Sequence, residues 1–191
     1  MLSSAALAAV IFVFTDIDDV FLLMAYFANP RYRVRDVVIG QYLGIGTLVA
    51  ASAAASLVSL VVSREIVGLL GLLPIAIGVK ELLELRRGTE GTGDEAPPVS
   101  GGSALSVAAV TIANGGDNIG VYTPVFATST PAELATMVAV FAVMVAPLIA
   151  FAYWLANHRA LGAPIRRYGH IATPIVLIGV GLYVLYSAAA P

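Results

Sequence analysis

Residues Leu2–Phe27 read LSSAALAAVIFVFTDIDDVFLLMAYF, an apolar run with three aspartates beyond its middle. Residues Ser103–Phe126 read SALSVAAVTIANGGDNIGVYTPVF and carry Asp117 in a similar setting. Both runs exceed the about 20 apolar residues that a helix needs to cross a bilayer. A carboxylate at mid-depth costs at least about 2.5–3.5 kcal/mol on insertion scales, so it is rare and usually functional. The two runs therefore predict membrane spans that carry a polar site.

The two runs also resemble each other. Moving Thr15–Phe27 along the chain by 99 positions lays it on Asn114–Phe126, and Asp18 then falls on Asp117. Two matched polar breaks at membrane depth are typical of transporters built from structural repeats, with the substrate bound between the repeats. This pattern predicts a transporter.

The composition excludes several classes of protein. The chain has 191 residues, of which 59% are hydrophobic and 12% are charged, whereas a soluble domain has about 45–50% apolar and about 25% charged residues. We therefore expect an integral protein of the lipid bilayer. There is no cysteine, which excludes disulfides, thiolate metal ligands and a cysteine nucleophile. No basic stripe of the kind that binds nucleic acid is present.

Six segments have the length and apolar character of membrane spans: Leu2–Phe27, Val37–Val62, Ile66–Leu85, Ser103–Phe126, Leu134–Ala156 and Ile171–Ser187. The first lacks a basic leader region and a cleavage site, so we expect it to be retained. Residues 86–102 are rich in glycine, proline and acidic residues and are expected to form a flexible linker. The sequence predicts a single all-α transmembrane domain over 1–191, with three helices in 1–85 and three in 103–191.

Basic residues predict the orientation of these spans. They follow the first, third and fifth spans, as Arg31, Arg33, Arg35, Arg86, Arg87, Arg159, Arg166 and Arg167, while the alternate side has Arg64. Loops rich in Lys and Arg face the cytoplasm. We expect a multi-pass protein of the plasma membrane with a cytoplasmic linker and both termini outside. With three spans per half, the second half is inverted relative to the first.

The polar stretches are expected to break helices 1 and 4 mid-membrane. A continuous helix would place Asp16 and Asp19 on one face and turn Asp18 away from them. Gly115 and Gly116 weaken the helix in the second stretch. Non-helical backbone at this depth is tolerated where it lines a polar cavity.

Together the two breaks supply an oxygen-rich, anionic group of side chains. Its candidate metal ligands are Asp16, Asp18, Asp19, Asp117, Asn114 and Asn118. Carboxylate and amide oxygens suit divalent cations. Closely spaced carboxylates repel each other, so a cation and protons compete for the same oxygens. We expect Asp18 and Asp117 to be the core ligands and Asp16 to act as a ligand or a proton carrier. Gln41 and Tyr42 are weaker candidates for an inner vestibule.

Other functions fit the residues less well. An intramembrane aspartyl protease also has two aspartates in the membrane, but it does not require the additional carboxylates and amides, so we expect no enzyme. An amino-acid exporter needs a group for the substrate carboxylate, and no Lys or Arg lies in the middle of a span, although the N-terminus of a broken helix could serve. An uncoupled channel for divalent cations also stays open. The aspartates could also have a purely structural role and only hold helices together. One polar pair would suffice for that role, and the chain has more polar residues than this in the two runs.

Three motifs carry a resemblance to a known family. They are TDIDDVF at Thr15–Phe21, GQYLG at Gly40–Gly44 and TIANGGDNIGVY at Thr111–Tyr122. They resemble the cadmium-resistance transporter family, in the lysine-exporter superfamily of small six-span exporters. The resemblance implies export of Cd²⁺, with Zn²⁺ as a second candidate, by proton antiport and without a bound cofactor. It assigns the family's aspartates and asparagines to the six candidate ligands named above.

The sequence leaves the identity of the ion and the oligomeric state open. Cadmium prefers sulfur, and the one sulfur expected near the aspartates is Met24, so oxygen ligands would suit Mn²⁺, Ca²⁺ and Mg²⁺ as well. The second span has a surface of small residues that includes Gly40, Gly44 and Gly46. Such surfaces let helices approach closely, either within one protomer or across a homodimer.

Overall fold

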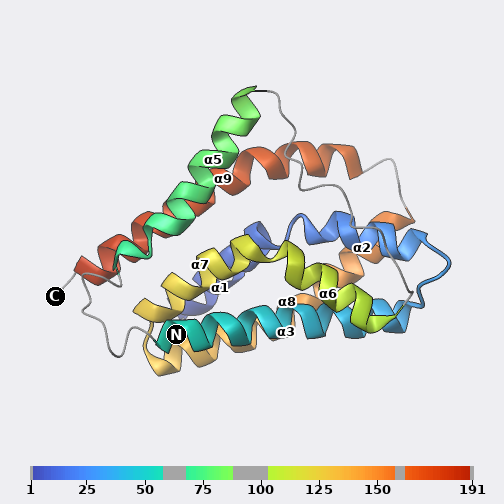
Figure 1. Cartoon of the computed structure of the whole chain (residues 1–191), viewed down its shortest axis with the longest axis horizontal. Coiled ribbons are helices and arrows are strands. Elements are labelled where there is room, and N and C mark those ends of the chain that lie inside the picture. The colour runs from blue at the N-terminus through green and yellow to red at the C-terminus, as the bar shows by residue number, and fades with distance from the viewer. Residues whose placement is uncertain (1, 58–67, 88–102, 158–161, 190–191) are drawn as a thin grey trace.

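The computed structural model describes residues 2–57, 68–87, 103–157 and 162–189 (Figure 1). These ranges contain eight helices and no strand: α1 (Leu2–Thr15), α2 (Asp19–Ala28), α3 (Val34–Ser56), α5 (Leu72–Arg87), α6 (Ala104–Asn114), α7 (Gly116–Thr128), α8 (Pro131–Ala156) and α9 (Gly162–Ala189). The predicted all-α class is confirmed. In the part described, α3 and α8 are long and apolar enough to cross a membrane by length and composition. The number of spans and the inversion of the two halves stay predictions.

The two polar runs are broken where the sequence predicts it. In the first, α1 ends at Thr15 and α2 begins at Asp19. In the second, α6 ends at Asn114 and α7 begins at Gly116, with Gly115 between them. In Figure 1, α7 continues from α6 after a visible bend. Each run is thus a pair of short helices, so the aspartates lie at helix ends and not on one regular face.

Several helix ends differ from the predicted spans. α5 continues through Arg87, so the first two residues of the expected linker are helical. α9 begins at Gly162 and not at Ile171, because hydropathy marks only the apolar part of a helix that extends beyond it. The expected end of the second span at Val62, the start of the third at Ile66 and residues 88–102 of the linker lie outside the described residues.

The start of α8 is fixed by local chemistry. Thr130 accepts a hydrogen bond from the backbone N–H of Glu133, and the Glu133 carboxylate accepts one from the backbone N–H of Thr130 at 2.9 Å. This reciprocal capping box satisfies donors that the first helical turn leaves unpaired. Pro131 at the first helical position has no N–H to satisfy and a backbone angle suited to a helix. α8 therefore begins slightly before the predicted apolar span.

The closest helix pairs join the two halves of the chain. α3 packs along α6 and α7, α8 packs along α1 and α2, and α5 packs along α9. In Figure 1 the α5–α9 pair forms a layer of its own above the other helices. This arrangement brings the break between α1 and α2 near the break between α6 and α7.

Aromatic side chains fill the core beside the breaks. Phe141 of α8 lies 5.7 Å from Phe12 and 4.7 Å from Tyr122, measured between ring centroids. All three rings are buried. Each such pair adds about 0.5–1.5 kcal/mol beyond the burial of its surface. The cluster holds α1, α7 and α8 together next to the polar residues.

Two glycines allow α3 to approach α6 closely. A Cβ atom at Gly40 would lie 2.5 Å from the Cβ of Val107, and one at Gly44 would lie 2.6 Å from the Cβ of Thr111. Gly46 has open space at the same position. The small-residue surface of α3 is therefore used within the protomer at Gly40 and Gly44. Whether the chain also forms a homodimer stays a prediction.

Candidate functional site

The aspartates of the first break meet the asparagines of the second. Asp16, Asp18 and Asp19 all accept hydrogen bonds from side-chain amides of Asn114 or Asn118. These contacts join positions that lie 95 to 102 residues apart in the chain. Five of the six predicted ligands thus belong to one polar region between α1–α2 and α6–α7.

Asp16 is completely buried and surrounded by neutral polar groups. Its Oδ1 accepts a hydrogen bond from Nδ2 of Asn118 at 3.1 Å, and its Oδ2 accepts one from the Tyr122 hydroxyl at 2.8 Å. The Thr15 hydroxyl lies 3.1 Å from both Oδ2 of Asp16 and the Tyr122 oxygen. A buried carboxylate is tolerated when its oxygens are hydrogen-bonded in this way.

Asp18 and Asp19 share one amide. Nδ2 of Asn114 donates to Oδ2 of Asp18 at 2.7 Å and lies 3.3 Å from Oδ1 of Asp19. The other oxygen of Asp19 accepts a hydrogen bond from Nε2 of Gln41 on α3. Oε1 of Gln41 in turn accepts a hydrogen bond from the Thr111 hydroxyl on α6 at 2.8 Å. Three helical elements are therefore tied together at Asp19.

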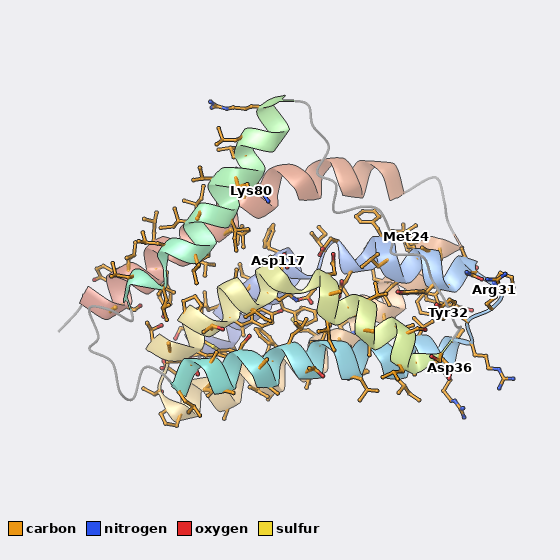
Figure 2. All side chains as sticks on the ribbon, viewed as in Figure 1. Met24, Arg31, Tyr32, Asp36, Lys80 and Asp117 are labelled. Carbon is orange, nitrogen blue, oxygen red and sulfur yellow. The ribbon has the colours of Figure 1, made fainter. Side chains whose placement is uncertain are left out.

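Asp117 lies in the first turn of α7, as Figure 2 shows. Its Oδ1 accepts a hydrogen bond from the backbone N–H of Asn118 at 2.9 Å. A carboxylate in the first turn of a helix is stabilised by the unpaired N–H groups and by the helix dipole. Asp117 thus contacts the same residue, Asn118, that donates to Asp16.

The side chains that the structure describes are not arranged as a complete set of metal ligands. Within the described ranges, no three acidic or histidine side chains are grouped closely enough to hold a metal ion. The amides of Asn114, Asn118 and Gln41 point N–H groups at the carboxylates. Met24 lies farther along α2, on the side of the labelled Arg31 (Figure 2). The arrangement is a hydrogen-bonded network of carboxylates and amides.

Four members of this network were not among the six predicted ligands: Thr15, Gln41, Thr111 and Tyr122. Tyr122 and Thr111 belong to the quoted family motif, but the sequence assigns them no role, and Gln41 was only a weak candidate. A signal existed for Gln41, since a polar side chain between Gly40 and Gly44 of an apolar helix needs a buried partner. Tyr42, its neighbour, is exposed on the protein surface.

Comparison with known proteins gives the family. A family model described as cadmium resistance transporter matches residues 12–190, which include both helix breaks and the whole network. The chain belongs to the cadmium resistance transporter family. Neither the curated proteins nor the solved structures gave a match. Membership in this transporter family implies a membrane location and a role in cadmium resistance transport.

Proposed function

We propose that this member of the cadmium resistance transporter family exports Cd²⁺ across the plasma membrane in exchange for protons. The observation that carries the proposal is the meeting of the two helix breaks. Carboxylates from one break and amides from the other lie within hydrogen-bonding distance, with Asp16 and Asp19 buried. Ionisable groups in such positions mark ion pathways in membrane proteins.

The network can become a cation site by rotation of its amides. Each amide carries a carbonyl oxygen beside its NH₂ group, so turning Asn114 or Asn118 by about 180° replaces a donor by an oxygen ligand. Together with Asp18, Asp19 and Asp117, these oxygens would surround a divalent cation, and Asp16 would ligate it or carry a proton. Zn²⁺ is the second candidate cargo.

A site of oxygen ligands suits an exporter. Sulfur ligands would hold Cd²⁺ more tightly, whereas an oxygen site releases its ion more easily. Protons and the cation compete for the same carboxylates. Exchange of one for the other keeps the charge of the buried site nearly constant, and this limits the free energy of placing charge inside the membrane.

The packing of the helices supports two inverted three-helix halves. α3 of the first half packs on α6 and α7 as α8 of the second half packs on α1 and α2, and α5 packs on α9. Each of these contacts has a counterpart when the halves are exchanged. α1 begins and α9 ends at the same side of the molecule in Figure 1, as expected for an even number of crossings. In this arrangement the cation would bind between the halves.

The test is metal uptake by proteoliposomes that contain the purified protein, with internal pH followed at the same time. We expect saturable uptake of Cd²⁺ or Zn²⁺, with proton movement in the opposite direction, and weaker uptake of Mn²⁺ and Ca²⁺. Both Asp18→Ala and Asp117→Ala should abolish uptake without lowering the amount of protein in the membrane. Asp36→Asn, at the start of α3 and outside the network, is the matched control and should retain it.

Each contrary result favours a different function. Uptake of none of the four ions would favour an amino acid or another small solute as the substrate. Metal uptake without proton movement would favour an uncoupled channel. Uptake that survives in both aspartate variants would show that the cation binds elsewhere.

A further inference from the structure

A buried glutamine on α3 connects the two helix breaks. The side chain of Gln41 is 1% exposed, and its two partners, Asp19 and Thr111, are 4% and 2% exposed. Gln41 donates through Nε2 to Oδ2 of Asp19 and accepts through Oε1 from the Thr111 hydroxyl at 2.8 Å. Its amide oxygen and its amide nitrogen thus both have buried partners.

The direction of these hydrogen bonds follows from the chemistry of the groups. An ionised carboxylate only accepts hydrogen bonds, so the NH₂ group of Gln41 faces Asp19 when that carboxylate is ionised. Oε1 then faces Thr111, whose hydroxyl can rotate to donate. Thr111 therefore fixes the orientation of the Gln41 amide, and the amide fixes one oxygen of Asp19. The other oxygen of Asp19 is left facing Asn114.

The close packing of α3 on α6 makes this chain of contacts possible. Gly40 precedes Gln41 directly, and Gly44 lies about one turn later on the same face. A Cβ at Gly40 would lie 2.5 Å from the backbone oxygen of Ala104, and a Cβ at Gly44 would lie 2.6 Å from the Cβ of Thr111. A side chain at either position would push α3 away from α6 and move Gln41 out of reach of its partners.

We propose that Gln41, oriented by Thr111, is a positioning residue that holds the Asp19 carboxylate for the transported cation and so sets the apparent affinity of the site. The inference rests on the proposed function. Carboxylates that ligate metals are themselves hydrogen-bonded, and loss of such a partner typically lowers affinity or activity about 10–100-fold. Gln41 anchors one Asp19 oxygen and leaves the other directed at the shared polar region.

The experiment measures initial rates of Cd²⁺ uptake by proteoliposomes over a range of Cd²⁺ concentrations, normalised to the amount of folded protein. Gln41→Leu and Thr111→Val should each raise the apparent KM about 10-fold or more, with a smaller change in the maximal rate. Thr111→Val keeps the shape that packs against Gly44, so it tests the hydrogen bond without opening the helix contact. A role in folding alone would lower the amount of active protein but leave the KM of the remainder unchanged.

Double variants test whether the residues act through each other. Residues of one hydrogen-bonded network have non-additive effects. Gln41→Leu combined with Thr111→Val should therefore raise the KM no further than Gln41→Leu alone. In an Asp19→Asn background, Gln41→Leu should change the KM less than it does in the wild type.

The control is Thr47→Val. Thr47 lies on the exposed face of α3 and donates to the backbone oxygen of Leu43 in its own helix at 2.7 Å, so its replacement should leave the KM unchanged. A wild-type KM in both Gln41→Leu and Thr111→Val, or fully additive effects in the double variant, would overturn the positioning role alone. Absence of cation uptake by the wild-type protein would instead overturn the proposed function, and the positioning role with it.

Discussion

At the residue scale, Asp16 is held by two neutral hydrogen-bond donors of α7. Tyr122 and Asn118 of α7 each donate to one of its oxygens. The Tyr122 ring also packs on Phe141, with ring centroids 4.7 Å apart. Tyr122 therefore contributes both apolar packing and a hydrogen bond, and these two contributions can be separated by removing only its hydroxyl.

Tyr122→Phe should destabilise the protein and weaken metal transport. The substitution keeps the ring and leaves Asp16 with one donor fewer inside the molecule. A hydrogen bond to a charged group contributes about 1.5–3 kcal/mol to stability, so we expect a loss of that order in the free energy of unfolding. Denaturant unfolding in detergent, together with Cd²⁺ uptake, measures both effects. Tyr186→Phe is the control because Tyr186 is 75% exposed; equal stability of the two variants would contradict the prediction.

At the scale of the elements, the contact between α3 and α6 depends on the absence of side chains at two positions. Gly40 and Gly44 face α6, whereas Gly46 of the same helix faces open space. Small residues let helix backbones approach in membrane proteins, where van der Waals packing and hydrogen bonds drive helix association. The three glycines thus offer a matched comparison within one helix.

Gly40→Ala should destabilise the protein, and Gly46→Ala should not. The new methyl group at position 40 would lie 2.5 Å from backbone and side-chain atoms of α6, and such overpacking typically costs about 1–3 kcal/mol. At position 46 the methyl group meets nothing within 4 Å, and alanine favours the helix by about 0.8–1 kcal/mol. Thermal unfolding of the two variants in detergent compares them. A lower midpoint for Gly46→Ala than for Gly40→Ala would show that the helices are packed differently.

At the scale of the whole molecule, the polar region lies where elements of both halves of the chain meet. α2 ends, and α8 begins, at opposite sides of the molecule in Figure 1. The basic residues Arg31, Arg33 and Arg35 follow α2, and basic loops face the cytoplasm. The end of α2 should therefore be cytoplasmic and the start of α8 external.

Single cysteines can test this orientation cleanly because the chain has none of its own. Ala28 and Ala132 are both exposed, at the end of α2 and the start of α8. In intact cells, a membrane-impermeant maleimide should label Ala132→Cys but not Ala28→Cys, which should react only after the membrane is permeabilised. Labelling of Ala28→Cys alone would reverse the orientation, and labelling of both would contradict placement on opposite sides of a membrane.

The helical class, the two helix breaks and most residues of the polar region could be predicted from the sequence alone. These follow from local properties, because carboxylates in an apolar run and the pair Gly115–Gly116 disfavour a continuous helix whatever the surroundings. The internal likeness of the two runs also indicated that Asp16, Asp18 and Asp19 would share a site with residues such as Asn114.

The pairing of the polar side chains, in contrast, depends on how the helices pack. Asp18 pairs with Asn114, while Asp117 caps the first turn of α7, although the sequence alignment of the two runs matches Asp18 with Asp117. Gln41 and Tyr122 became part of the site through contacts across 22 to 106 residues of chain. Such contacts depend on the distance between packed helices and on their rotation. Small residues and aromatic rings elsewhere in the chain set this distance and rotation, so the local pattern around each aspartate does not reveal them.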